Sequence, residues 1–434
     1  MQLIGGMAMD GWRRALLAVV CGVAVAGVYA AQPVLEQMGR DLGVPAERAG
    51  WIVAIGQIGY LAGLVLLVPL GDVLDRRRLI AAHLVLTAAG TALTSLAQAG
   101  WVAFAGLATA GLFAVVVQTT VAYVAAVAPP AERGRSIGVV TSGVVAGILG
   151  ARVVTGVLAE MWGWRSVYAA LAALSLILAA LVRTALPPDD RPRRMAATRR
   201  VPAGEGPDEA VATERVPAGK RSGRGVVVAR VPFGERLFLT RGLVTFFLFA
   251  SFGTLWSGLA LPLAGDPWRL EESQIGMFGV AGLAGALGAA RAGRWADAGR
   301  AAPVTGIALA LLIGSWAAIG QLRWSLWLLI AGIVVLDFAV QVVHVSNQHR
   351  LTAAYPGRTS GVVGGYMIFY SLGSALGAAT TTAVFAAHGW TGASLLGAGF
   401  AACALAVWAV DRRVVPERAR SQKTPSTARG RGLG

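Results

Sequence analysis

Residues 71–78 read GDVLDRRR, and residues 293–300 read GRWADAGR. Each stretch is a short polar segment between long apolar runs, with an aspartate four residues after a glycine. The second copy follows the first by 222 residues, and three further matches recur at offsets of 223 to 226: Gln118 with Gln341, Arg133 with Arg358, and Gly163-Trp164 with Gly389-Trp390. A repeat of this length predicts two copies of one structural unit.

The apolar content of the chain indicates a membrane protein. Of 434 residues, 56% are hydrophobic, which is about 243 residues. Twelve spans of about 20 residues require about 240. Charged residues make up only 14%, against about 25% in soluble domains. The composition excludes an ordinary soluble enzyme and a disordered chain. Cys21 and Cys403 both lie in apolar runs, so no disulfide framework or cysteine-based zinc site is expected.

Twelve apolar runs are long enough to cross a layer of about 30 Å. They lie near residues 15–35, 49–70, 79–97, 101–127, 136–159, 165–185, 238–264, 274–292, 303–322, 324–347, 359–386 and 390–410. Backbone polar groups in lipid must bond internally, so each run predicts a helix. The first run also resembles a signal peptide, because Arg13 and Arg14 precede it. Its removal would break the repeat, and we interpret it as a span.

The predicted fold class is therefore an all-α integral membrane protein. Twelve transmembrane helices form two six-helix bundles in parallel, related by a pseudo-twofold axis along the membrane normal. A polar linker separates them, in which Arg-Val-Pro-x-Gly recurs every fifteen residues, and we expect it to be disordered. The predicted parts are an N-terminal tail, a first bundle, a basic linker, a second bundle and a C-terminal tail, at residues 1–14, 15–186, 187–236, 237–411 and 412–434.

The distribution of basic residues predicts the orientation. If the N-terminus is cytoplasmic, 32 of the 38 Lys and Arg residues fall on the cytoplasmic side and 5 on the other, while Arg152 lies within the fifth run. Basic loops stay cytoplasmic, so both termini are expected inside. The net charge of +16 then reflects topology and contact with anionic lipid rather than with nucleic acid. The use of Arg over Lys points to a bacterium, and so to its plasma (inner) membrane.

These features resemble the major facilitator superfamily, whose signature between spans 2 and 3 is G-x-x-x-D-R-x-x-R-R. Tyr29-Ala-Ala-Gln-Pro33, Gly163-Trp-Arg165 and residues 337–348 look like its twelve-span drug and sugar efflux branch, the drug:proton antiporters. The resemblance implies alternating access around a central site. The arginine that this branch often carries in span 4 is absent from residues 104–117, which is a departure from its usual route of proton coupling.

The repeated motif predicts a cytoplasmic gate. Gly71 permits a tight bend, and Asp75 meets the positive end of a helix dipole. We hypothesise a charge latch that holds the two halves together when the protein opens outward; the alternative is a lipid-facing charge cluster that only sets topology. The candidate gate residues are Gly71, Asp72, Asp75, Arg76, Arg78, Gly293, Asp297 and Arg300.

Polar side chains spaced by three and four mark one face of spans 1, 4, 7 and 10. A polar face in the bilayer must meet water or protein, and in the resembled fold these helices line the cavity. The candidate substrate-cavity residues are Tyr29, Gln32, Gln118, Tyr123, Ser251, Thr254, Trp256 and Gln341.

Spans 2, 5, 8 and 11 carry small residues spaced by four, which let helix backbones approach closely. In the resembled fold these helices form the interface between the halves. The rows include Gly59, Gly63, Gly143, Gly147, Gly282, Gly373 and Gly377.

Two charges lie deep in apolar runs. Asp337 is about 17 Å and Arg152 about 24 Å from the cytoplasmic edge at ~1.5 Å per residue. An intramembrane charge is a functional candidate by default. We hypothesise that Asp337 carries the driving proton, with His344 as a relay and Arg152 as its partner or as a substrate anchor. A structural ion pair or a helix-to-helix hydrogen bond is the alternative.

The leading hypothesis is a secondary active transporter working by proton-coupled efflux of a small amphipathic or sugar-like molecule. The alternatives are a proton-coupled importer of an anionic small molecule and a receptor of the same fold without transport. An enzyme is not expected, because the four histidines are scattered and no G-x-x-x-x-G-K-[ST] loop occurs. We expect a monomer whose partners are substrate, protons and lipid, with no cofactor or metal.

Overall fold

The computed structural model describes residues 10–72, 74–129, 132–187, 233–288, 301–355 and 359–421. Within these ranges the regular secondary structure is entirely helical. The second motif copy, with Gly293, Asp297 and Arg300, lies outside them, as do most of the predicted linker and the end of the C-terminal tail.

The first half contains six span-length units. They are α1 (Gly11–Tyr29), α3 (Gly50–Leu66), α4 (Arg76–Ser95), the broken pair α5 (Gly100–Phe113) and α6 (Val116–Val127), α7 (Arg133–Trp162) and α8 (Trp164–Ala185). The short helices α2 (Leu35–Asp41), η1 (Ala46–Arg48) and η2 (Val68–Asp72) complete the turns between them.

The second half repeats this plan. Its helices are α10 (Arg236–Gly258) with the short α11 (Ala260–Ala264), α12 (Glu272–Gly288), α14 (Ala301–Ile319), α15 (Leu326–Ala354) and α16 (Thr359–Ser421). A kink at Gly389, with φ of 62°, divides α16 into two helices, and Gly163 with φ of 76° separates α7 from α8. Both positions need a glycine because other residues rarely adopt this backbone conformation. The repeated Gly-Trp pair therefore marks the same turn in each half.

Nine helices in the described chain are long and apolar enough to cross a membrane. One of them is the kinked α16, which counts as two, and α12 with 17 residues and α14 with 19 supply the remaining span-sized units. Together these give twelve span-sized units among the described residues, and the prediction of an all-α membrane fold is confirmed.

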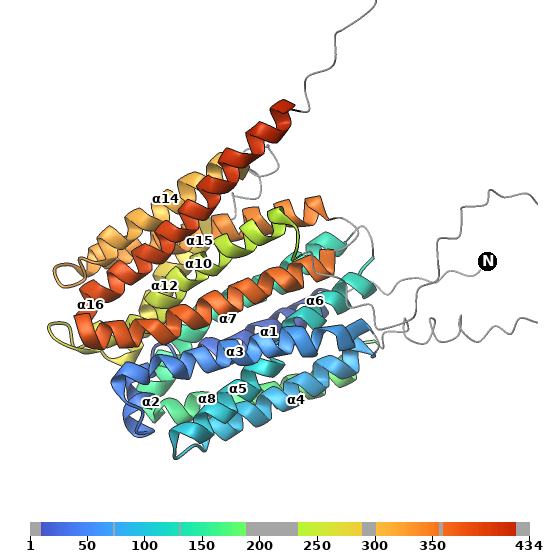
Figure 1. Ribbon diagram of the computed structural model, residues 1–434. Helices are drawn as coiled ribbons and strands as arrows, with labels where there is room; N and C mark the ends of the chain where they lie inside the picture. Colours follow the sequence, from blue (N-terminus) through green and yellow to red (C-terminus); the bar gives the residue numbers. More distant parts are fainter. Residues whose placement is uncertain are drawn as a thin grey trace, which may run out of the picture.

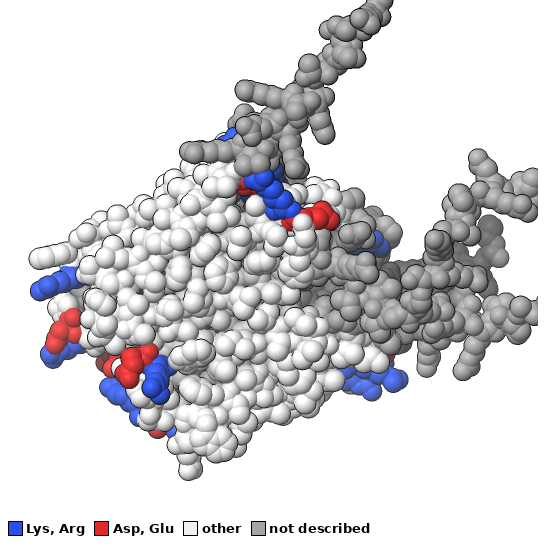
Figure 2. All heavy atoms as spheres, viewed as in Figure 1, with Lys and Arg blue, Asp and Glu red and all other residues white. Residues whose placement is uncertain are grey.

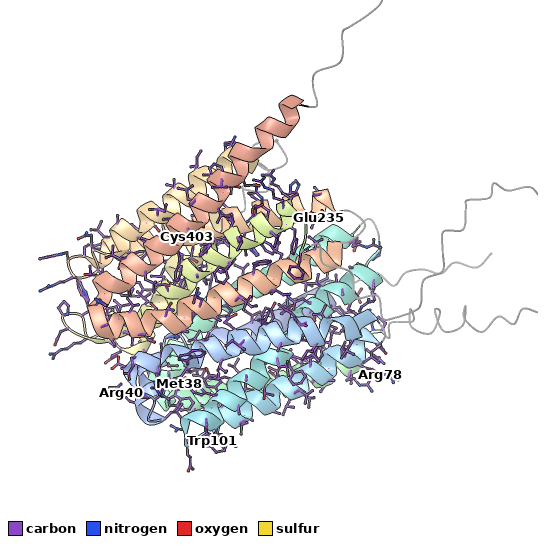
Figure 3. All side chains as sticks on the ribbon, in the orientation of Figure 1. Met38, Arg40, Arg78, Trp101, Glu235 and Cys403 are labelled. Atoms are coloured by element: carbon purple, nitrogen blue, oxygen red, sulfur yellow. The ribbon has the colours of Figure 1, made fainter. Side chains whose placement is uncertain are left out.

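The two halves lie side by side, and the axes of their helices are roughly aligned (Figure 1). Charged side chains gather at the two ends of the bundle, and the visible surface between them is almost free of charge (Figure 2). Arg40 and Arg78 lie at opposite ends (Figure 3). We name these the Arg40 end and the Arg78 end. The charge-free belt is the surface that lipid would cover.

Two helix pairs join the halves, α7 with α12 and α3 with the first part of α16. The hydrogen bonds between these pairs lie near the Arg40 end. The backbone N–H of Gly50 donates to Thr382 Oγ1 at 3.0 Å, and the N–H of Ser273 donates to Glu160 Oε2 at 3.3 Å. A Cβ at Gly156 would come within 2.3 Å of the Glu272 carbonyl oxygen. The halves are therefore in direct backbone contact at the Arg40 end.

Most of the small residues expected at this interface instead pack within their own half. A Cβ at Gly59 or Gly63 would meet the backbone of α5, and one at Gly143 would meet that of α1. Gly147 likewise faces α1, while Gly373 and Gly377 face α10. The prediction was wrong for these six positions, because a four-residue spacing shows that a face is tightly packed but not which helix packs on it.

Candidate functional site

Arg152 is the centre of the candidate site. It projects from α7 in the first half and is 2% exposed. Its Nε donates to Gln32 Oε1 at 3.1 Å, and its guanidinium carbon lies 3.7 Å from the ring centroid of Trp256. Trp256 belongs to α10, so the arginine contacts the opposite half. An amide oxygen and a π face partly compensate a buried cation.

Asp337 supplies the opposite charge from α15 in the second half. It is also 2% exposed, and it interacts electrostatically with Arg152. Within the described part of the chain, Arg152 Nη2 has no hydrogen-bond partner. The Asp337 carboxylate also interacts through a side-chain hydrogen bond with Trp256. The site thus holds a buried cation and a buried anion that interact electrostatically, and the cation keeps an unused hydrogen-bond donor, an arrangement suited to binding a proton or a ligand.

A row of glycines on α12 makes this meeting possible. A Cβ at Gly276 would lie 2.5 Å from the Arg152 carbonyl oxygen, and one at Gly279 would lie 3.1 Å from Arg152 Cβ. Further along, a Cβ at Gly282 would come within 3.0 Å of Asp337 Oδ2, and one at Gly285 within 3.1 Å of Asp337 Cβ. The backbone of α12 therefore fits between the helices that carry the two charges.

Sequence reasoning missed most of this row, since it searched for small residues at a spacing of four. The glycines recur every three residues from 276 to 285, and that period could have identified them. Phe252, whose ring centroid lies 5.8 Å from the Arg152 guanidinium carbon, carries no signal that separates it from other apolar residues of its span.

A small cavity opens beside Arg152 between the halves. Its lining combines Gln32 and Pro33 of the first half with Trp256, Leu259, Ala260 and Ile275 of the second. The lining is mostly apolar and carries one cation and one amide. The volume of the cavity is about 10 Å³, which holds about one water molecule, so a larger ligand would require the halves to separate here.

A hydrogen bond between Tyr29 Oη and Tyr370 Oη also crosses from one half to the other. The Tyr370 ring centroid is 4.1 Å from that of Phe249, which in turn lies 5.3 Å from the ring of His344. These four aromatic rings form a connected group with residues from both halves. We name Tyr29, Phe249, His344 and Tyr370 the aromatic cluster.

His344 is separated from the charged pair along α15. It lies seven residues from Asp337, which corresponds to about 10 Å of helix. Its Nδ1 is 2.9 Å from Tyr366 Oη, and its Nε2 is 3.2 Å from Gln348 Nε2. The structure therefore brings Asp337 and Arg152 together but places His344 with other partners.

The other cavity candidates are dispersed. Gln118 donates to Tyr60 Oη at 2.6 Å, and Tyr123 donates to the Pro187 carbonyl at 2.9 Å, both within the first half. Ser251 donates to the Gly397 carbonyl inside the second half, and Thr254 donates to the Ala250 carbonyl of its own helix. Gln341 is half-buried on α15. Only Tyr29, Gln32 and Trp256 of this set gather around Arg152.

Three residues of the gate motif at residues 71–78 make contacts within the first half. Asp75 caps α4, since its Oδ1 accepts the N–H of Arg77 at 2.9 Å. Arg78 Nε lies 3.6 Å from Asp75 Oδ2, and Arg77 Nη1 donates to the Leu186 carbonyl at the end of α8. Gly71 lies in η2.

Comparison with known proteins places the chain among transporters. The sequence pattern of the Major Facilitator Superfamily matches residues 17–264 and 241–433. An uncharacterized transporter of Escherichia coli K12, YgaY, is 36% identical over 393 residues, covering 91% of this chain and 94% of that protein. Two solved structures share the fold at low identity. A bacterial homologue of the human lysosomal transporter Spinster, inward-facing and occupied, has a TM-score of 0.72 at 14% identity and covers 93% of this chain and 96% of its own. The nucleoside transporter NupG has a TM-score of 0.67 at 12% identity, and the match covers 92% of this chain and 99% of the NupG chain.

Proposed function

Because the chain belongs to the Major Facilitator Superfamily and is a multi-pass membrane transporter, we propose that it works by alternating access as a proton-coupled exporter. The cargo we propose is a small amphipathic or sugar-like molecule, as in the drug:proton antiporter branch that its motifs resemble. The two halves would rock about the site that contains Arg152 and Asp337.

The observation that carries this proposal is the buried charge pair shared between the halves. Arg152 comes from the first half and Asp337 from the second. A rocking motion that separates the halves at the Arg40 end would therefore change the surroundings of both charges at once. A charge left alone in the bilayer costs at least about 2.5 kcal/mol on the insertion scale, so the carboxylate is favoured to bind a proton when Arg152 moves away or binds cargo.

The proposed cargo class rests on the side chains that surround Arg152. Trp256, Phe252 and Tyr29 present aromatic rings around the Arg152 guanidinium, and Gln32 adds an amide. Aromatic rings stack on the apolar faces of ring compounds, while the amide and the guanidinium bind hydroxyl or carbonyl oxygens.

An importer of an anionic small molecule is the second candidate, and one observation favours it. Arg152 Nη2 has no hydrogen-bond partner in the described part of the chain, so a carboxylate or phosphate of the cargo could bind there. The direction of pH-dependent flux separates the two candidates.

We further propose that the Arg78 end is cytoplasmic, with both termini inside and the protein in the bacterial plasma membrane. The excess of basic residues at the predicted inner loops supports this orientation. In this state the halves touch at the Arg40 end, while Asp75, Arg77 and Arg78 are engaged within their own half. The proposed gate latch would form in the opposite state, when the Arg78 end closes.

The proposal is tested in everted membrane vesicles with a panel of candidate substrates. Wild-type protein should accumulate cargo when a proton gradient is imposed, and Asp337→Asn should lose this uptake while still exchanging labelled for unlabelled cargo. Asp266→Asn, which alters an exposed carboxylate near the Arg40 end, is the matched control and should transport normally. Undiminished proton-driven uptake by Asp337→Asn at every pH would contradict the coupling role. Proton-linked flux of an anion in the import direction would support the second candidate instead.

A further inference from the structure

A groove lies on the outer surface of the first half, between α4 and α8. Its volume is about 530 Å³, and its floor is formed largely by the small residues Ala81, Ala82, Ala179 and Ala180. The two helices pack directly against each other beneath it. The groove lies away from the Arg152 site, whose lining shares no residue with it.

Among the residues that the structure describes, two arginines are the only charged ones that line this groove. They are Arg78 near the start of α4 and Arg183 near the end of α8. Because the helices are antiparallel, both residues lie at the same end, and Figure 3 shows Arg78 at the outer edge of the bundle. Among the described residues, Arg78 pairs with Asp75 through Nε at 3.6 Å, and Arg183 forms no ion pair. Two guanidinium groups at the mouth therefore have donors left for an anion.

The apolar part of the groove runs from these arginines toward the middle of the bundle. It extends to Val85 on α4 and to Leu176 on α8, each seven residues from its arginine and so about 10 Å along the helix. Val85 is 46% exposed and Leu176 is 50% exposed, which is expected of side chains that face lipid. Two arginines at the membrane edge can bind a phosphate, and the apolar channel directly below them can hold an acyl chain. The groove therefore matches the chemistry of a phospholipid.

We propose that this groove binds an anionic phospholipid from the leaflet at the Arg78 end. The headgroup phosphate lies between Arg78 and Arg183, and one acyl chain follows the alanine floor between α4 and α8. Arg77 has no part in this role because it does not line the groove, and its Nη1 donates to the Leu186 carbonyl instead. The bound lipid fixes the start of α4, which carries the gate motif, against the end of α8.

The test is native mass spectrometry of the purified full-length chain, with added phosphatidylglycerol or phosphatidylcholine of identical acyl chains. Wild-type protein should retain phosphatidylglycerol more tightly. Each basic residue near the membrane surface contributes a roughly fivefold preference for anionic lipid, so Arg78→Ala with Arg183→Ala should weaken phosphatidylglycerol binding by about 30-fold. The matched control is Arg40→Ala with Arg323→Ala, which removes two exposed arginines at the other end and should leave the affinity unchanged.

A second variant tests the groove itself while keeping both charges. Ala82 and Ala180 are exposed in the floor of the groove. Replacing both with Phe should fill the channel and weaken the binding of both lipids without unfolding the helices. Equal affinity of the wild type for the two lipids would overturn the proposal. An equal loss in the control variant would show general surface electrostatics, and displacement of the lipid by soluble glycerol phosphate would show a site for free phosphate. Either outcome also overturns it.

Discussion

Replacing Gly276 with Ala tests whether contact between α7 and α12 holds the halves together at the Arg40 end. The new Cβ would lie 2.5 Å from the Arg152 carbonyl oxygen and 3.3 Å from Val153 Cα. Because both neighbours are backbone atoms, no side chain can rotate away. Ordinary contact begins near 3.4 Å, so the two helices must separate locally by about 0.9 Å.

The expected cost follows from this geometry. Adding a methyl group to a well-packed contact costs about 1–3 kcal/mol. The cost falls only on the state in which α7 touches α12, so the population closed at the Arg40 end should decrease by roughly five- to 150-fold relative to the open one. Gly150→Ala is the matched control, because it lies on α7 two residues before Arg152 and its Cβ would meet nothing within 4 Å.

The measurement is the distance between spin labels on the two halves. Cysteines would replace the exposed residues Arg40, in the first half, and Arg323, in the α14–α15 turn, after the exposed Cys403 has been changed to Ala. Gly276→Ala should shift the distance distribution toward longer values, and Gly150→Ala should not. If the two variants give the same distribution as the parent, the contact does not control closure and the reasoning is wrong.

Three further predictions concern residues outside the charge pair. Arg241 and Asp411 form a buried ion pair with Nη2 and Oδ2 2.8 Å apart, so Arg241→Met should lower the free energy of unfolding by about 3–5 kcal/mol; adding Asp411→Leu should recover most of this in a thermal unfolding assay, and no recovery would contradict the pairing. Tyr29→Phe removes the hydroxyl that bonds to Tyr370 across the halves. This substitution should lower the free energy of unfolding by about 0.5–1.5 kcal/mol, measured by the same assay. Tyr370→Phe is the partner variant, and additive losses in the double variant would refute the bond. Asp75→Ala removes the cap of α4 and should destabilise the protein by about 0.5–2 kcal/mol, whereas Asp75→Asn keeps a good cap and should be nearly neutral; equal losses would show that the negative charge rather than the cap matters.

The helices could be predicted because their signals are local. A run of about 20 apolar residues in lipid has no alternative to the helix, and Gly163 and Gly389 mark corresponding turns through their positive φ. The broken pair α5 and α6 was not expected, because residues 101–127 form one apolar run. Hydropathy measures whether a segment belongs in lipid and does not register a local break in its hydrogen bonds.

The members of the site were harder to predict than the helices. Periodicity placed Tyr29 and Gln32 on polar faces, as it did Ser251 and Tyr123, and Trp256 was expected as an aromatic wall of the pocket. The structure gathers Tyr29, Gln32 and Trp256 around Arg152, whereas Ser251 bonds inside the second half and Tyr123 inside the first. A helical period shows which residues share a face, but the inner side of one bundle and the space between two bundles both satisfy a polar face.

By itself, the sequence determined the number of spans, the duplication and the presence of two isolated charges in apolar runs, because each of these depends only on residues close together in the chain. Only the tertiary structure decided that Arg152 lies close enough to Asp337 to interact electrostatically. This proximity requires α12 to fit between α7 and α15, and it can do so because glycines at 276, 279, 282 and 285 leave room for its backbone. Contacts between residues so far apart in the chain are set by the shapes of all three helices together, which no single stretch of sequence contains.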